Sequence, residues 1–362
     1  PISVADVYVI SATTGRVEIT LWTDNLKMKS PLKFLFLTIL GFLLLTIWFF
    51  GKPWNLTKST CASQYETEYN IKKVLSSSKD ETFFVDESDA IDLYEKIRVI
   101  CIILTTEKVL NTKLSAVNNT WARRCNKHFF VMTTKLHRAD IISSEYADNR
   151  KNLIHKVRSA FEFIHDKYID DVDWVFKADD DTYAIIENLR FLLSHYDASK
   201  PGYLGFIFDK YVNNGYMSGG AGYVISRQGI KQLVQNGIRG NKCPVLKTKD
   251  NPELSEDLEI GRCLESNQVP RLNSHDVYGR DTFHPYPVEQ HLFGNLPQYL
   301  YSWCKQPPVE GRNCCSQFTI SFHYMNPRSI LLIDHLLYKT SVFGRTLPKQ
   351  IGKVIQVGQY RP

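Results

Sequence analysis

Three consecutive carboxylates, Asp179, Asp180 and Asp181, follow an apolar run in the stretch "DWVFKADDDTY". Two carboxylates about 4 Å apart repel by roughly 4 kcal/mol at an effective dielectric constant of about 20, so three of them together require bulk water or a cation. In an extended chain Asp179 and Asp181 point to one side and Asp180 to the other. Two converging carboxylates suit a divalent cation such as Mn²⁺ or Mg²⁺. The alternative is a solvated acidic turn that caps the next helix.

The elements around these carboxylates predict an open α/β sheet. Residues 97–105 and 128–134 are apolar, β-branched runs typical of strands buried on both faces, and residues 113–125 predict a helix between them. Residues 150–166 carry an amphipathic helical pattern that leads into the strand "DWVFKAD", and a further helix is predicted at 182–196. Ligands bind beyond the carboxyl ends of strands in such sheets, which favours the metal site over the acidic turn.

The composition excludes some classes of protein. The chain has 362 residues, of which 43% are hydrophobic and 12% aromatic, enough for one large or two smaller packed domains. Its formal charge of +6 is mild, and basic residues are scattered among acidic ones. We therefore expect no nucleic-acid partner.

One segment, residues 34–50, is apolar, uncharged and close to the roughly 20 residues that span a bilayer. It is longer than the hydrophobic region of a cleaved signal peptide, and no small-x-small cleavage site follows it. More lysines precede than follow it, which predicts a cytoplasmic N-terminus and a type II, single-pass membrane protein. Because "MKSPLKF" at Met28 resembles a natural start, we expect residues 1–27 to lie outside the native chain. The predicted parts are a cytoplasmic tail (1–33), a signal anchor (34–51), a lumenal stem (52–92), a folded catalytic domain (93–330) and a C-terminal tail (331–362).

The eight cysteines all lie after the apolar segment, where the secretory lumen is oxidising. Because the chain has no CxxC pair, disulfides are favoured over zinc. Asn55 and Asn118 begin glycosylation sequons, which fits the same compartment.

Six motifs, in chain order, together resemble the core 1 β1,3-galactosyltransferase family: "DWVFKADDDTY", "GYMSGGAGYVIS", "EDLEIGRC", "TFHPYPVEQHL", "PPVEGRNCCS" and "SFHY". The resemblance runs from about Arg98 to Tyr324. It implies a GT-A glycosyltransferase fold with a Rossmann-like sheet, a Golgi address and a homodimer. It further implies inverting transfer of galactose from UDP-galactose to GalNAc on Ser or Thr of mucin-type glycoproteins.

The resemblance also assigns roles to residues. His323 of "SFHY" joins Asp179 and Asp181 as a ligand, and nitrogen beside carboxylates suits Mn²⁺. Asp257 is the candidate base for the acceptor hydroxyl. It lies in the first turn of a helix whose predicted N-cap is Ser255, where the dipole is expected to keep it ionised. Donor contacts are expected from Thr105, Arg150, Lys156, Asp180, Gly219 and Gly220, and acceptor stacking from Tyr301 and Trp303. The glycines allow close approach to a donor sugar or, almost equally, a tight turn.

The disulfides expected first are Cys101 with Cys125 and Cys243 with Cys263, followed by Cys304 with Cys314 or Cys315. Three stretches depart from the family pattern: "SSEYADNR" lacks its lysine motif, His155 replaces a tryptophan, and "CKQ" at 304–306 replaces an aromatic stretch. Two alternatives therefore stay open. One is a non-catalytic, chaperone-like relative, although the intact aspartate triplet is against it, and the other is a β1,3-glycosyltransferase for a different sugar or acceptor.

Overall fold

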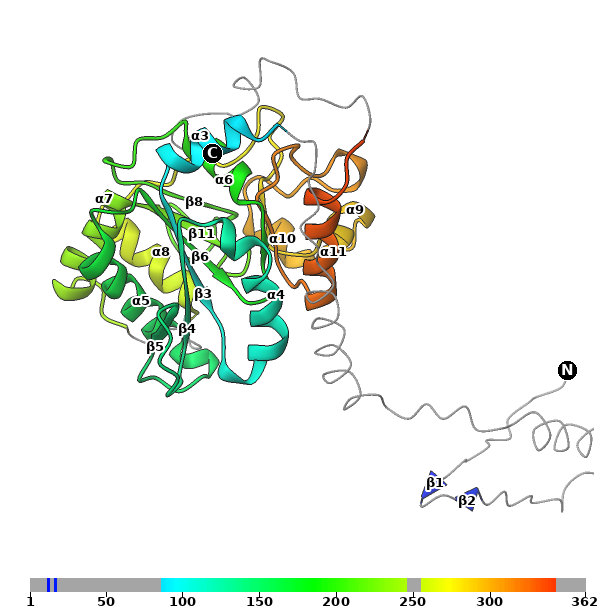
Figure 1. Ribbon diagram of the computed structural model, residues 1–362, viewed down its shortest axis with the longest axis horizontal. Helices are drawn as coiled ribbons and strands as arrows, with labels where there is room; N and C mark the ends of the chain where they lie inside the picture. The colour runs from blue at the N-terminus through cyan, green and yellow to red at the C-terminus, as the bar shows by residue number, and fades with distance from the viewer. Residues whose placement is uncertain (1–11, 14–15, 18–85, 246–254, 343–362) are drawn as a thin grey trace, which may run out of the picture. The chain divides into compact units, whose positions relative to one another are not determined.

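The computed structural model describes residues 12–13, 16–17, 86–245 and 255–342 (Figure 1). Two units are distinguished, residues 1–60 and 61–362. In the first unit, β1 (Ala12–Thr13) and β2 (Arg16–Val17) pair antiparallel. The predicted anchor at 34–51 and most of the predicted stem lie outside the described residues. Within the described ranges, no helix has both the length and the apolar character that crossing a membrane requires.

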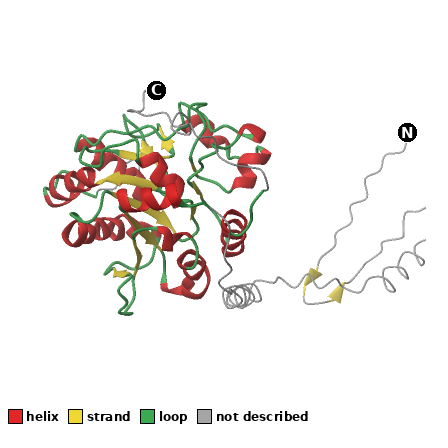
Figure 2. Ribbon diagram, turned by 45° about the horizontal axis from the view of Figure 1, so that its top comes forward, coloured by secondary structure: helices red, strands yellow, loops and turns green. Residues whose placement is uncertain are grey.

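A six-stranded sheet with the order β5-β4-β3-β6-β11-β8 forms the centre of the second unit (Figure 2). Strands β5, β4, β3 and β6 are parallel, whereas β11 runs antiparallel to both β6 and β8. The prediction of an open, mostly parallel α/β sheet is therefore confirmed. The strand bounds are β3 Val99–Leu104, β4 Lys127–Met132, β5 Ile141–Ser143, β6 Trp174–Asp179, β8 Tyr203–Gly205 and β11 Tyr223–Ser226.

Apolar cores cover both faces of this sheet, because successive side chains of a strand point in opposite directions. In β3, Cys101 and Ile103 belong to one core, and Ile100 and Ile102 belong to the other. The second core includes the buried face of α5 (Leu153–Tyr168), as its amphipathic pattern predicts. The first core includes α4 (Ser115–Asn118) and α6 (Ile186–Leu193).

A second, three-stranded sheet has the order β12-β13-β7, with β12 (Phe283–His284), β13 (Ser321–Phe322) and β7 (Tyr183–Ala184). The predicted helix at 182–196 is wrong at its start, since residues 183–184 pair with β13 and α6 begins only at Ile186. The partner strand is distant in sequence, so the local pattern contained no sign of it. The predicted helix at 113–125 is likewise divided, into a π-helical turn (Leu110–Leu114), α4 and a 3₁₀ turn (Trp121–Arg124).

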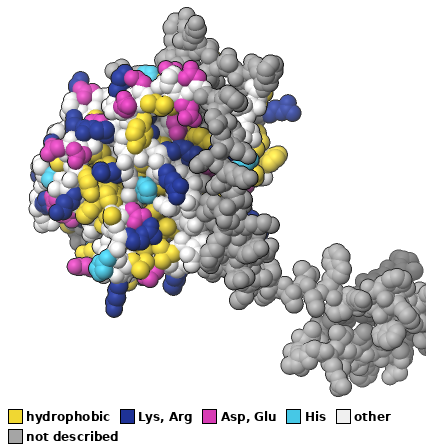
Figure 3. Space-filling model, viewed as in Figure 1, with side chains coloured by type: hydrophobic (Ala, Val, Ile, Leu, Met, Phe, Trp, Pro, Cys, Tyr) yellow, Lys and Arg dark blue, Asp and Glu magenta, His cyan; other side chains and the backbone are white. Residues whose placement is uncertain are grey.

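The remaining elements complete the unit that holds both sheets. The short strands β9 (Ile207–Phe208) and β10 (Tyr216–Met217) pair antiparallel. Acidic and basic side chains are interspersed on the face seen in Figure 3. The remaining helices are α3 Ser88–Lys96, α7 Arg227–Lys231 with the π-helical Gln232–Arg239, α8 Glu256–Ser266, α9 Val288–Phe293, α10 Gln298–Trp303 and α11 Pro327–Tyr338. The remaining 3₁₀ turns are Glu107–Val109, Arg150–Asn152 and Gly311–Asn313.

The disulfides differ in part from those predicted. Cys101 bonds to Cys125 and Cys243 bonds to Cys263, as expected. The expected bond from Cys304 is wrong, because Cys314 and Cys315 bond to each other and Cys304 is a buried free thiol. The sequence could not decide which of these three cysteines pair, and the structure shows that Cys304 has no disulfide partner among the described residues.

Candidate active site

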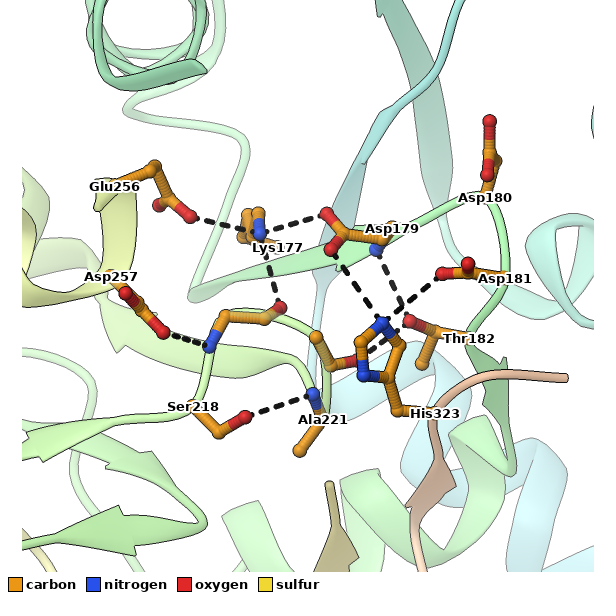
Figure 4. Close-up of polar contacts among 12 residues, drawn as sticks. Lys177, Asp179, Asp180, Asp181, Thr182, Ser218, Ala221, Glu256, Asp257 and His323 are labelled. Carbon is orange, nitrogen blue, oxygen red and sulfur yellow. Dashed lines mark hydrogen bonds and ion pairs between the residues drawn. The ribbon is translucent and has the colours of Figure 1, made fainter. Parts of the chain in front are cut away.

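The predicted metal ligands meet in the structure. Asp179 ends β6, Asp181 follows two residues later, and His323 comes directly after β13. One ligand atom from each lies within 4.8 Å of the others. His323 Nε2 is 3.2 Å from Asp181 Oδ1 and 3.9 Å from Asp179 Oδ2 (Figure 4). The three side chains therefore converge on one point beyond the carboxyl end of a central strand.

Backbone contacts hold this arrangement together. The amide of Met325, just past His323, donates to the carbonyl of Asp181 at 2.8 Å. Thr182 Oγ1 accepts a hydrogen bond from the amide of Asp179 and donates one to the carbonyl of Gly220 at 2.7 Å. The aspartate turn is thus tied to the segment that carries His323 and to the glycine loop.

Asp180 points away from the cluster, as the alternation of the strand predicts (Figure 4). Its Oδ2 accepts a hydrogen bond from Thr105 Oγ1 at 2.8 Å. Lys113 Nζ bridges Asp180 Oδ1 at 3.1 Å and Asp181 Oδ2 at 3.0 Å. Burial raises the pKa of Asp180 despite the charge of Lys113. Burial also acts to raise the pKa of Asp181, but the hydrogen bond with His323 and the charge of Lys113 lower it to about 2.

A buried lysine connects the metal cluster to helix α8. The side chain of Lys177, in β6, is 1% exposed, and its Nζ lies 2.9 Å from Asp179 Oδ1 and 3.0 Å from Glu256 Oε2. It also donates to the carbonyl of Gly219 at 3.0 Å. Burial lowers the pKa of Lys177, but the charges of Asp179 and Glu256 raise it above its ordinary value. Lys177 is therefore charged, and it neutralises two carboxylates that would otherwise repel.

Positions 219 and 220 have no room for a side chain, because neighbouring protein atoms lie too close to the backbone. A Cβ on Gly220 would lie 2.0 Å from His323 Cε1, and one on Gly219 would lie 2.9 Å from Glu256 Oε2. The segment also turns tightly, since the amide of Gly222, at φ +82°, donates to the carbonyl of Gly219. These glycines thus allow a close approach to His323 and α8 and form a tight turn, and their contact with a donor sugar stays a prediction.

Asp257, the predicted base, lies in the first turn of α8 (Figure 4). Its Oδ2 accepts a hydrogen bond from the amide of Gly219 at 3.0 Å, and its Oδ1 accepts one from Leu258. Burial raises the pKa of Asp257, and these two amides with the charge of Lys177 act in the opposite direction. The environment therefore moves Asp257 toward the higher pKa that suits a proton acceptor, rather than only keeping it ionised as its helix position predicts.

Lys156 and Arg150, which are also predicted to contact the sugar donor, lie in different surroundings from each other. Lys156 is buried, and its Nζ donates to the carbonyl of Thr105 at 3.1 Å and to the carboxylate of Asp148. Arg150 is exposed at the start of the 3₁₀ turn that precedes α5. Tyr146 stacks on His155 at 4.7 Å, so the "SSEYADNR" departure and the histidine that replaces tryptophan are in contact.

The predicted acceptor residues belong to α10. Trp303 packs against Tyr299 at 4.9 Å between ring centroids and against Phe208 at 5.7 Å. Tyr301 is half-buried, and burial together with a hydrogen bond to Glu310 raises its pKa to about 12.

A line of aromatic residues leads from this helix to the metal cluster. The hydroxyl of Tyr299 lies 3.0 Å from that of Tyr286, whose ring is 5.3 Å from Tyr324. Tyr324 stacks on His323 at 3.9 Å and is 56% exposed. An exposed aromatic face beside the cluster could bind a sugar ring.

The ligand atoms of Asp179, Asp181 and His323 fit a divalent cation of borderline hardness. Two carboxylates and one imidazole match Mn²⁺ better than Ca²⁺, which prefers oxygen alone. Asp179 Oδ1 is buried, and among the described residues its polar contact is the ion pair with Lys177 at 2.9 Å.

Sequence reasoning missed Lys113, Lys177 and Glu256 as parts of the site. Lys177 could have been found, since a lysine inside an otherwise apolar buried strand requires a carboxylate partner. Glu256 adjoins the predicted base, but its role depends on where α8 packs. Nothing in the sequence pattern marks Lys113.

The structure thus places two carboxylates and a histidine beyond a central parallel strand, and Lys177 and the Gly219 segment connect this cluster to the first turn of α8. The model of the Fringe-like family matches residues 95–337. The chain belongs to the Fringe-like family.

Curated relatives agree with this assignment. Glycoprotein-N-acetylgalactosamine 3-beta-galactosyltransferase 1 of Xenopus laevis is 38% identical over 263 residues, which are 72% of this chain and 71% of that protein. Beta-1,3-glucosyltransferase of Mus musculus is 34% identical over 106 residues, covering 28% of this chain and 20% of the relative. Chondroitin sulfate synthase 3 of Homo sapiens is 24% identical over 180 residues, covering 45% and 20%. The resemblance to core 1 β1,3-galactosyltransferases is confirmed.

Proposed function

We propose that this chain transfers galactose from UDP-galactose to O3 of GalNAc on Ser or Thr of glycoproteins, with inversion and with Mn²⁺ as cofactor. The observation that carries the proposal is the convergence of Asp179, Asp181 and His323 beside Asp257, in a chain 38% identical to a glycoprotein-N-acetylgalactosamine 3-beta-galactosyltransferase. The fold is proposed to be of the GT-A type.

Asp179, Asp181 and His323 would hold the metal ion. When bound, a divalent cation neutralises the diphosphate of a nucleotide-sugar donor and stabilises it as a leaving group. Lys177 forms ion pairs with Asp179 and Glu256 and holds both in place, and Lys113 does the same for Asp181.

Inversion in one step requires a group that accepts the proton of the attacking hydroxyl. Asp257 is suited to this role because it is fixed by the Gly219 amide and has a raised pKa. A positioned base contributes about 10²–10⁴-fold to the rate. Tyr324, exposed beside His323, is proposed to stack on the acceptor sugar together with the α10 residues Tyr301 and Trp303.

A role in donor binding stays a prediction for six residues: Thr105, Asp180, Arg150, Lys156, Gly219 and Gly220. Thr105 donates a hydrogen bond to Asp180, so the two side chains would lie together at the edge of a uridine site. A Golgi membrane location with a single span, and a homodimer, are further parts of the proposal.

The test is transfer from UDP-galactose to a GalNAc-α-Thr glycopeptide by the purified chain, with Mn²⁺ or with EDTA. We expect metal-dependent formation of Gal-β1,3-GalNAc. Asp181→Asn should lower kcat/KM by at least about 10²-fold by weakening metal binding, and Asp257→Asn should lower kcat by about 10²–10⁴-fold with metal affinity kept. Asp171→Asn, at an exposed acid, is the matched control.

Full turnover by Asp181→Asn would contradict the proposed metal site. Absence of transfer by a folded, disulfide-bonded wild-type chain would favour the chaperone-like alternative. Transfer from another nucleotide sugar, or to another acceptor, would favour the alternative of a different β1,3-glycosyltransferase.

A further inference from the structure

A second cluster of metal-binding side chains lies on the other side of β13. It consists of His284 at the end of β12, His291 in α9, and the adjacent Cys314 and Cys315, which follow the 3₁₀ turn Gly311–Asn313. One ligand atom from each of the four residues lies within 4.8 Å of the others. We call these four residues the His–Cys cluster.

The two histidines are buried without the hydrogen bonds that buried imidazoles normally make. His291 is 0% exposed and His284 is 1% exposed. Neither nitrogen of His291, nor Nδ1 of His284, has a hydrogen-bond partner in the part of the chain that the structure describes. His284 Nε2 has one contact, with Thr319 Oγ1 at 3.3 Å. Each unsatisfied buried polar atom costs about 1–3 kcal/mol, so three together require an explanation.

The surroundings leave the ring nitrogens available as ligands. The two imidazole rings are 4.8 Å apart and nearly perpendicular, and His284 stacks on Phe322 at 4.7 Å. Burial lowers the pKa of His284 well below its ordinary value and lowers the pKa of His291 to about 4. Neutral imidazole is the form that binds metal.

A disulfide between Cys314 and Cys315 does not satisfy these nitrogens, because disulfide sulfur is at best a weak hydrogen-bond acceptor and neutral imidazole needs both a donor and an acceptor partner. Two thiolates and two imidazoles, in contrast, are the ligands of a tetrahedral zinc site. With Zn²⁺ such a site has no net charge, which suits a buried position.

We propose that His284, His291, Cys314 and Cys315 form a Cys₂His₂ zinc site that exchanges with the Cys314–Cys315 disulfide. A dithiol reductant transfers two electrons and two protons to the disulfide, giving two thiols and an oxidised dithiol. Zn²⁺ then binds the two sulfurs and one nitrogen of each histidine, and the two thiol protons are released. The disulfide and the zinc ion are thus alternative occupants of one place.

The site would stabilise β13, which directly precedes His323. His284 pairs with Phe322 in the β12–β13 ladder, and the amide of His323 donates to the carbonyl of His284 at 3.1 Å. A metal ion that connects β12, α9 and the Cys314–Cys315 segment would therefore hold the backbone next to the active site. The proposal does not depend on which sugar the chain transfers.

The experiment uses the purified full chain, freed of metal with EDTA, treated with a dithiol and kept without oxygen. Cobalt(II) replaces zinc as the probe, because tetrahedral thiolate coordination gives a sulfur-to-cobalt charge-transfer band and intense visible bands. We expect about one equivalent of thiolate-bound cobalt per chain, displaced by Zn²⁺. His291→Leu and Cys315→Ser should bind cobalt more weakly, so that the full set of tetrahedral bands does not form at one equivalent, with circular dichroism showing that they are folded.

Two variants serve as matched controls. Asp181→Asn removes a ligand of the other cluster, and Cys304→Ser removes the free buried thiol, so both should keep the band. Absence of the band in folded, reduced wild type, or cobalt affinity and visible bands in His291→Leu equal to those of wild type, would overturn the proposal. Alkylation and mass spectrometry show whether Cys101–Cys125 and Cys243–Cys263 survive the treatment. Should they open, the zinc content of chain purified without chelators from zinc-supplied cells decides, provided that alkylation shows Cys314 and Cys315 to be reduced: about one zinc lost in His291→Leu supports the site, and no zinc in such a wild-type chain overturns it.

Discussion

The two clusters on either side of β13 satisfy their polar groups in different ways. Around Asp179 and Asp181, two lysines neutralise the carboxylates and the ligands are partly exposed. In the His–Cys cluster the imidazoles are fully buried, and three of their nitrogens have no hydrogen-bond partner among the described residues. Phe322 and His323 are adjacent, and their side chains face opposite clusters because strand side chains alternate. The protein's own cations therefore balance the carboxylates of the first cluster, whereas the described residues leave three ring nitrogens of the second without a partner.

The largest effect is expected where a buried charge loses its partner. Lys177→Met leaves Glu256 and Asp179 without their cation, and breaking a buried ion pair costs about 3–5 kcal/mol. Urea unfolding of the EDTA-treated protein measures the loss. Lys113→Met is the matched control, since Lys113 is 34% exposed and its ion pairs should contribute about 0–1 kcal/mol. Equal losses of unfolding free energy in both variants would contradict the proposed contrast between a buried and a solvated lysine.

A smaller effect is expected from His291 in the metal-free, disulfide-bonded protein. Burial lowers its pKa to about 4, below the unfolded value of about 6.5, although Asp281 and Glu310 act in the opposite direction. The unfolded chain therefore takes up the proton first, so stability is present above pH 6.5 and is lost as the pH falls toward 4, by on the order of 3 kcal/mol. His291→Leu should remove this acid-side loss and leave stability at pH 7 unchanged or slightly raised. If the free energy of unfolding depended on pH in the same way in His291→Leu and in wild type, this prediction would be wrong.

The smallest effect concerns His275, a buried histidine that does have a partner. Its Nε2 lies 3.2 Å from Asp281. Burial lowers the pKa of His275, but the hydrogen bond and the charge of Asp281 raise it above the ordinary value. Its contribution is therefore fully present below pH 6.5 and is lost as the pH rises through the folded pKa, the opposite sign to His291. His275→Gln should cost about 1.5 kcal/mol at pH 6 and progressively less at higher pH. A cost that grows with pH would show that the ion pair is not what holds the ring.

Much of the fold could be predicted because its signals are local. The apolar runs that became β3, β4 and β6 are β-branched and continuous, which only a strand buried on both faces requires. The position of the carboxylates followed from the end of β6. Strand β7 was missed because two residues contain no periodicity, and its pairing with β13 was needed to define it.

The sequence by itself determined the buried strands β3, β4 and β6 of the central sheet and the carboxylate turn at its edge. The meeting of His323 with Asp179 and Asp181 was expected from family resemblance, and only the fold brings these residues together. Tertiary structure also decided that Lys177 joins Asp179 to Glu256, that Gly220 faces His323, and that Cys314 and Cys315 lie beside two histidines. The absence of a CxxC pair argued against zinc, but a metal site needs its ligands close in space and not in sequence. Contacts between distant residues depend on how the two sheets pack, and no local pattern contains that information.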